Sequence, residues 1–96
     1  MPSFDQLLAR RDALLAAAAR HGADHIRVFG SVARNEATAQ SDVDFLVKMQ
    51  AGRSLLDLAG LQQDLEDLLG CRTDVVTENG LHPMLRERVL TEAREI

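Results

Sequence analysis

The chain has 96 residues, 46% of them hydrophobic but only 3% aromatic, which supports one domain, over residues 1–96, with a core of Leu, Val and Ala. Its net charge of −4 argues against a surface that coats nucleic acid, so no direct nucleic-acid partner is expected. Cys71 is the only cysteine, which excludes an internal disulfide and a cysteine-based zinc site. The sequence has no long apolar run and no signal pattern, so we expect a cytoplasmic protein without a membrane partner.

The first half of the chain is predicted to alternate helix and strand. Ser3-Phe4-Asp5-Gln6 reads as a capping box, and apolar residues at helical spacing predict one helix from there to His21-Gly22. Residues 25–29 alternate as a first strand. A short helix from Ser31 to about Asn35 and a loop then lead to a second strand, Asp42 to Met49.

The second half continues this alternation. Ser54 to Asp57 caps a helix that Gly70 ends, and its apolar stripe consists of Leu55, Leu58, Leu61, Leu65, Leu68 and Leu69. Residues 72–77 predict a third strand and residues 78–80 a turn. A final helix is expected over residues 81–96, beginning near Pro83. The predicted order is α-β-α-β-α-β-α, an α/β (α+β) protein with at least three strands.

Two aspartates sit on the second predicted strand. Because strand side chains alternate, Asp42 and Asp44 are expected to point the same way, with Val43, Phe45 and Val47 in the core. Two carboxylates so placed repel each other and favour no fold by themselves. Their pairing therefore predicts a hard cation between them, most naturally Mg²⁺.

A glycine and a serine close the first predicted strand. Gly30 permits unusual backbone angles and the close approach of another group, and Ser31 is expected to cap the following short helix. Free amide N–H groups there would suit a phosphate. A phosphate-holding turn beside metal-holding carboxylates is an arrangement for a nucleoside triphosphate with magnesium.

These residues resemble the signature of a known family. Gly30-Ser31, a spacer of ten residues, and Asp42-Val43-Asp44 are similar to the motif of the polymerase-β-like nucleotidyltransferase superfamily. The fuller stretch, Gly30 to Arg34 with Ser41 to Val47, resembles its minimal members, the MNT-domain antitoxins of HEPN-domain ribonuclease toxins. The resemblance implies a small mixed sheet with helices packed on it.

The resemblance also implies roles for single residues. Asp42 and Asp44 would hold two Mg²⁺ ions, and Asp74 on the third strand would ligate one of them and help to remove a proton from the acceptor hydroxyl. Gly30 and Ser31 would hold the triphosphate of ATP. Arg34 would add positive charge there.

The implied reaction transfers AMP from ATP to a hydroxyl, expected to be a tyrosine, on a partner HEPN toxin, which is thereby silenced. Two alternatives remain: an antitoxin that acts by forming a complex, and a nucleotidyltransferase that modifies a small-molecule hydroxyl.

Each residue also has a structural interpretation. Asp42 and Asp44 would then solvate an edge strand, Asp74 would be an ordinary surface residue, and Gly30-Ser31 would form a simple turn and cap. In that interpretation Arg34 pairs with Glu36 or with solvent.

Overall fold

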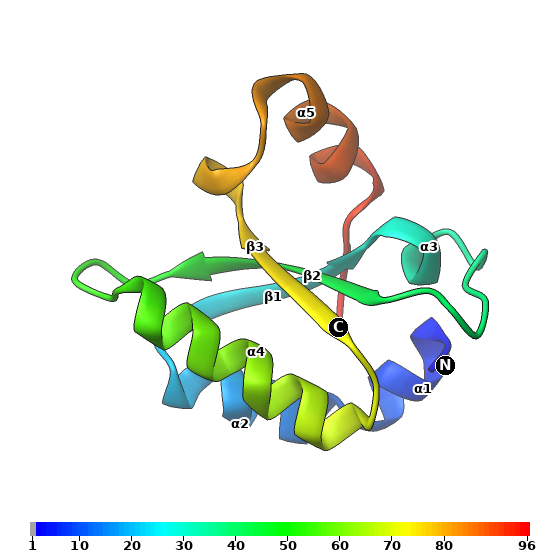
Figure 1. The fold of residues 1–96 in the computed structure, drawn as a ribbon, viewed down its shortest axis with the longest axis horizontal. Helices are drawn as coiled ribbons and strands as arrows, with labels where there is room; N and C mark the ends of the chain where they lie inside the picture. Colours follow the sequence, from blue (N-terminus) through cyan, green and yellow to red (C-terminus); the bar gives the residue numbers. More distant parts are fainter. Residues whose placement is uncertain (1) are drawn as a thin grey trace.

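The computed structural model describes residues 2–96, and its first half contains two helices where one was predicted (Figure 1). The elements are α1 (Phe4–Ala9), α2 (Arg11–Arg20), β1 (Ala23–Phe29), α3 (Gly30–Ala33) and β2 (Val43–Met49).

The break between α1 and α2 falls at Arg10, whose backbone leaves the helical region at φ −108° and ψ 18°. At this break, the Arg10 guanidinium donates to the carbonyl oxygen of Leu68 in the last turn of α4 (Leu55–Leu69), a helix far away in the sequence. The capping box of Ser3 and Gln6 is confirmed.

The second half contains α4 (Leu55–Leu69), β3 (Thr73–Thr77), a 3₁₀ turn η1 (Glu78–Gly80), α5 (Pro83–Glu92) and β4 (Arg94–Glu95). The prediction that the last helix runs to residue 96 is wrong. The chain turns extended at Ala93, and β4 pairs with β1 instead. The free backbone N–H and C=O groups at the edge of β1 form hydrogen bonds with residues 94–95, and this pairing is favoured over continuation of the helix.

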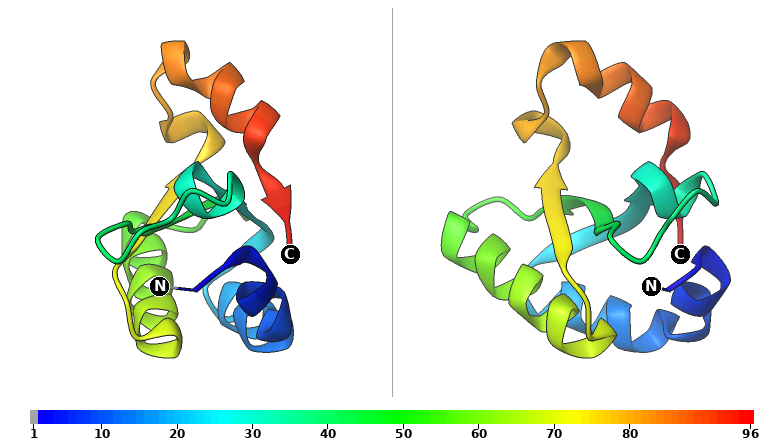
Figure 2. Two further views of the ribbon diagram at one scale, coloured as in Figure 1. Left: turned by 90° about the vertical axis from the view of Figure 1, so that its right-hand side faces the viewer. Right: turned by 45° about the vertical axis from the view of Figure 1, so that its right-hand side comes forward.

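The four strands form one mixed sheet in the order β3-β2-β1-β4. β1 runs antiparallel to β2 and to β4, whereas β2 and β3 are parallel and are connected through α4. Helices α2 and α4 lie against one face of the sheet, and α5 lies on the other side (Figures 1 and 2).

The main core lies between the sheet and the α1, α2 and α4 layer. Val43, Phe45 and Val47 are fully buried in it, as the alternation on β2 predicts. Leu46 is also fully buried but is outside this core cluster, because it points to the other face, where α5 lies. Both faces of β2 are therefore covered.

Helix α4 begins and ends as its sequence predicts. Ser54 and Asp57 form a capping box, and Gly70 ends the helix in the left-handed conformation at φ 66°. The predicted apolar stripe is wrong at its first member, because Leu55 is 81% exposed and Leu56 beside it is 83% exposed. The start of α4 projects beyond the layer that buries the rest of the stripe.

Among residues 2–96, no helix has both the length and the apolar character that crossing a membrane requires.

Candidate active site

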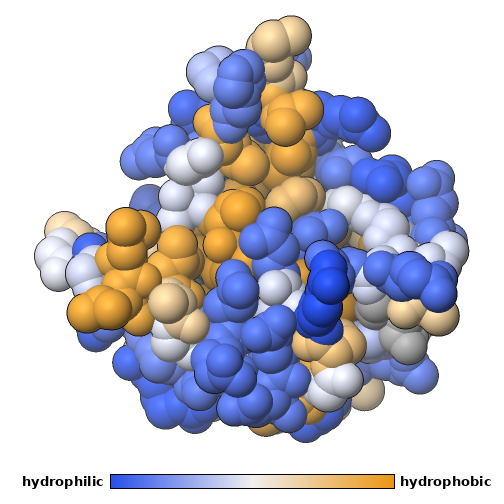
Figure 3. Space-filling model, in the orientation of Figure 1, coloured by the Kyte–Doolittle hydropathy of each residue, from blue (hydrophilic) through white to orange (hydrophobic). Residues whose placement is uncertain are grey.

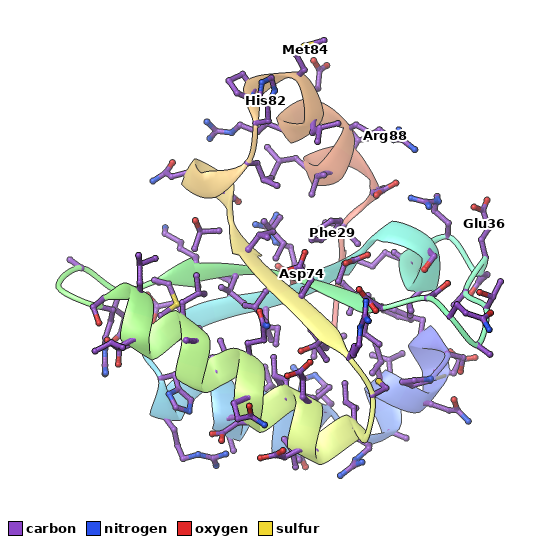
Figure 4. All side chains as sticks on the ribbon, viewed as in Figure 1. Phe29, Glu36, Asp74, His82, Met84 and Arg88 are labelled. Atoms are coloured by element: carbon purple, nitrogen blue, oxygen red, sulfur yellow. The ribbon has the colours of Figure 1, made fainter. Side chains whose placement is uncertain are left out.

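Three neighbouring strands bring Phe29, Asp44 and Asp74 into one row. Asp44 is the register partner of Phe29 on β1 and of Asp74 on β3. Directly paired residues share a face, and this face is opposite to the one on which Val43 and Phe45 enter the core. Asp44 and Asp74 are therefore adjacent carboxylates on the side of the sheet where α5 lies; Phe29 and Asp74 are labelled in Figure 4.

Asp44 is the more buried of the two. Its carboxyl pKa is raised to about 6, mainly by burial and also by the negative charges of Asp74 and Asp42, against a lowering effect of Arg34. A carboxylate held close to other carboxylates favours a bound cation, because the positive charge of the cation offsets the repulsion between the carboxylates.

Gly30 lies directly against Asp44. Its φ of +73° is in the left-handed region, and a Cβ atom at this position would collide with the Asp44 carboxylate. The close approach predicted from the sequence is thus present, and the group that approaches is a candidate metal ligand.

Ser31 does not have the capping role that was predicted. Helix α3 begins one residue earlier, with Phe29 at its N-cap and no side-chain cap. The extended backbone of β1 runs directly into the helix through Gly30, so Ser31 is already inside the first turn. Its hydroxyl is not used to cap the helix.

Arg34 follows α3 and pairs with two carboxylates. Its Nε donates to Glu36 at 3.1 Å, as the structural interpretation predicted, and its Nη1 donates to Glu92 at 3.0 Å. Hydrogen bonds to Glu36 and then to Glu92 raise the pKa of the guanidinium. Glu92 also accepts from the backbone N–H of Gly30 at 3.0 Å. Sequence reasoning missed Glu92, because nothing in the pattern of α5 indicates that its last turn reaches α3.

Asp42 precedes β2 instead of opening it, and its carboxylate pairs with Arg72. Arg72 Nε lies 3.1 Å from Asp42 Oδ1, and the Arg72 side chain is 82% exposed. Among residues 2–96, no group of three or more His, Cys, Asp or Glu side chains is placed to hold a metal ion as it stands. Asp42 would have to leave an exposed ion pair to join Asp44 and Asp74, and such pairs contribute little stability.

The residues fit a hard divalent cation on these grounds. Asp44 and Asp74 are adjacent oxygen donors that repel one another, and Asp42 is close enough to affect the charge state of Asp44. Asp44 and Asp74 would hold the ion, and Asp42 would complete the set.

A hollow of about 610 Å³ opens on the sheet face beyond this row, and its polar lining includes Arg27, Lys48 and Glu78. None of the six candidate residues lines it. Its size alone therefore does not make it the catalytic centre.

The fold and this row of residues define a class of protein. A small mixed sheet that sets two carboxylates side by side, with a glycine packed on one of them, is the core of an enzyme that transfers nucleotidyl groups.

Comparison with known proteins makes the assignment specific. The family model described as nucleotidyltransferase domain matches residues 11–96, and the chain belongs to that family. A Methanocaldococcus jannaschii relative, provisionally named a protein adenylyltransferase, is 47% identical over 77 residues, 80% of this chain and 83% of its own. The protein adenylyltransferase MntA of Thermococcus cleftensis is 44% identical over 73 residues, 76% of this chain and 74% of its own.

A solved structure, provisionally called a minimal nucleotidyltransferase, is 55% identical, with a TM-score of 0.87 over 99% of this chain and 97% of its own. A toxin–antitoxin crystal structure with AMP-PNP shares the fold at 20% identity and a TM-score of 0.74, over 88% of this chain and 69% of its own. The resemblance to minimal nucleotidyltransferases is confirmed, and the protein is an enzyme of this class.

Proposed function

We propose that this nucleotidyltransferase is the antitoxin of a toxin–antitoxin pair and transfers AMP from ATP, with Mg²⁺, to a tyrosine hydroxyl of a HEPN ribonuclease toxin. The observation that carries the proposal is the row formed by Asp44 and Asp74, with Gly30 packed against Asp44. The name of the Thermococcus relative, a protein adenylyltransferase, supports a protein as acceptor.

Each residue has a part in the proposed reaction. The acceptor oxygen attacks the α-phosphorus of ATP, the bond from that phosphorus to the bridging oxygen breaks, and pyrophosphate leaves. Asp74 accepts the hydroxyl proton; its exposed position leaves it accessible to an acceptor. Asp42, Asp44 and Asp74 would hold Mg²⁺, which when bound would supply positive charge to offset the negative charge of the reacting phosphates.

The phosphates would lie at the end of β1. The Gly30 N–H and the Ser31 hydroxyl donate to phosphate oxygens there, and Arg34 adds a planar, permanently charged donor. The hydroxyl of Ser31 suits this role because it caps no helix.

Exposed apolar side chains support a protein partner. Leu55 and Leu56 on α4, and Met84 and Leu85 on α5, are 52% to 85% exposed. Figure 3 shows hydrophobic surface at the start of α4 and below α5 on one side of the molecule. Apolar surface of this kind is typical of interaction sites. Solved relatives with this fold are described as toxin–antitoxin structures.

The test is transfer of label. The chain is incubated with labelled ATP, Mg²⁺ and a HEPN ribonuclease from the same genome, and intact mass is expected to show whole AMP units on the HEPN protein. An Asp42→Asn, Asp44→Asn double variant should lose transfer while remaining folded. Asp12→Asn on the exposed side of α2 serves as the control, because it removes an acidic charge away from the site. Transfer by the double variant would contradict the metal assignment.

The exposed apolar surface also favours the second candidate, an antitoxin that neutralises its toxin by binding alone. Tight binding of the HEPN protein without any gain in its mass would establish that alternative.

A further inference from the structure

Glu92, the last residue of α5, places its carboxylate on groups that the proposed function assigns to the phosphates of ATP. Its Oε1 accepts from the Gly30 N–H at 3.0 Å and from Arg34 Nη1 at 3.2 Å, and its Oε2 accepts from the same Nη1 at 3.0 Å. Only 18% of the Glu92 side chain is exposed. The carboxylate is thus held inside the site.

Carboxylate and phosphate oxygens make the same kind of contact. Both are anionic acceptors that bind a backbone N–H and a guanidinium through short, charge-assisted hydrogen bonds. The Gly30 N–H has one hydrogen and cannot donate fully to Glu92 and to a phosphate at once. A phosphate that takes this donor must therefore displace Glu92.

The position of Glu92 makes such a displacement feasible. Ala93, the next residue, is already outside the helix at φ −64° and ψ 136°, so Glu92 lies where α5 ends. The residues that anchor this end of the chain come afterwards, where Arg94 pairs with Val28 of β1. Rotation of the Glu92 side chain, or fraying of one residue of helix, would open the donors without separating β4 from the sheet.

We propose that Glu92 is an internal competitor of the nucleotide: it occupies the Gly30 N–H and Arg34 in the free protein and leaves them when the phosphates of ATP bind. The proposal rests on the proposed function, because that function assigns the phosphates to these donors. It assigns to Glu92 a specific effect, which is to weaken nucleotide binding. A residue that merely held Arg34 in place would strengthen it.

The sign of this effect is the test. The Kd of Mg²⁺·AMP-PNP is measured by calorimetry for the wild type, Glu92→Gln and Glu87→Gln. Glu92→Gln keeps the shape of the side chain but removes its charge, and the Kd should fall by roughly tenfold, the change that corresponds to one lost charge-assisted hydrogen bond. Glu87, exposed on the same helix, is the matched control, and its variant should bind as the wild type does.

A second measurement does not depend on a variant. The Gly30 amide proton, observed by NMR in the wild type, should shift when Mg²⁺·AMP-PNP is added, and it should already be shifted in nucleotide-free Glu92→Gln. Thermal unfolding of each variant establishes that it is folded.

The outcomes separate the two proposals. An equal or higher Kd for Glu92→Gln, or an equal fall for both variants, would overturn the competitor role and leave the proposed function intact. Failure of all three proteins to bind Mg²⁺·AMP-PNP would overturn the proposed function and this inference together.

Discussion

At the scale of single residues, Asp44 is a candidate metal ligand whose position is unfavourable for the fold in the absence of a cation. Its carboxyl is partly buried beside Asp74 and has a pKa of about 6, above the ordinary value of 3.8. In the metal-free protein between pH 4 and pH 6, the folded state therefore keeps a proton on the Asp44 carboxyl that the unfolded state has already released. The stability of the folded state therefore falls as the pH rises from about 4 to about 6 and, as far as Asp44 is concerned, stays at the lower level above pH 6, where the folded protein contains an unfavourable, partly buried charge.

We expect Asp44→Asn to stabilise the metal-free protein at pH 7.5 by on the order of 1 to 2 kcal/mol, after allowance for solvent screening. The gain should shrink as the pH falls from 6 to 4, because the wild-type carboxyl is then neutral as well. Urea unfolding in EDTA over this pH range measures it. A gain of equal size at pH 4 and pH 7.5 would show that charge is not its cause.

Gly30 is constrained twice, by its backbone and by its neighbour. Gly30→Ala should destabilise the protein by about 1 to 3 kcal/mol and abolish AMP transfer, because the new methyl group displaces the Asp44 carboxylate. Gly52→Ala is the matched control: its φ of +86° carries the same backbone strain, but nothing lies within 4 Å of an added Cβ. Chemical unfolding of both variants isolates the collision, and equal losses would argue against it.

At the scale of elements, the caps of α4 fix where the connection between the two parallel strands begins and ends. Ser54 accepts from the backbone of Leu56, and Asp57 accepts from the backbone N–H of Ser54 at 2.9 Å. Backbone hydrogen bonding to Ser54 is the largest cause of the lowered carboxyl pKa of Asp57. The capping box therefore stabilises α4, the helix that connects the strand of Asp44 to the strand of Asp74.

Ser54→Ala should lower stability by about 1 kcal/mol, which corresponds to a fall in Tm of roughly 4–8 °C for a domain of this size. Ser54→Thr, which keeps a hydroxyl acceptor, should recover most of the loss. Calorimetric melting of the three proteins measures both effects, and equal Tm values for alanine and serine would show that the cap contributes nothing.

At the scale of the whole molecule, one face of the small sheet forms the core and the other face carries the candidate site. Its buried face packs on α2 and α4, and its other face holds the candidate site under α5, while the exposed leucines of α4 and α5 lie outside both. The exposed apolar surface proposed for a partner and the candidate site are therefore distinct and can be altered separately.

A Leu55→Ser, Leu56→Ser double variant should weaken binding of the HEPN protein by roughly tenfold or more, because both exposed apolar side chains lose their contacts with the partner. Its binding of Mg²⁺·AMP-PNP should not change. Leu8→Ser, at a leucine 39% exposed on α1, is the control for general effects of polarity. Interferometry with immobilised HEPN protein measures the affinities, and an unchanged affinity of the double variant would place the partner elsewhere.

The sequence by itself determined the alternation of Val43, Phe45 and Val47 on β2, the caps of α4 and the need for glycine at residue 30. Each of these depends on residues a few positions apart, where periodicity and backbone preference are decisive. It also indicated the family, because the glycine–serine pair and the two aspartates stand at a fixed spacing.

Only the tertiary structure decided which groups meet across the chain. The contact of Glu92 with Gly30 spans 62 positions, that of Arg72 with Asp42 spans 30, and β4 forms only because the edge of β1 offers free backbone groups. A local pattern holds no information on such pairs, because they arise from the way the sheet and α5 fold back on one another. The structure also placed Asp74 beside Asp44, since the register of two parallel strands is fixed by the helix and the core between them.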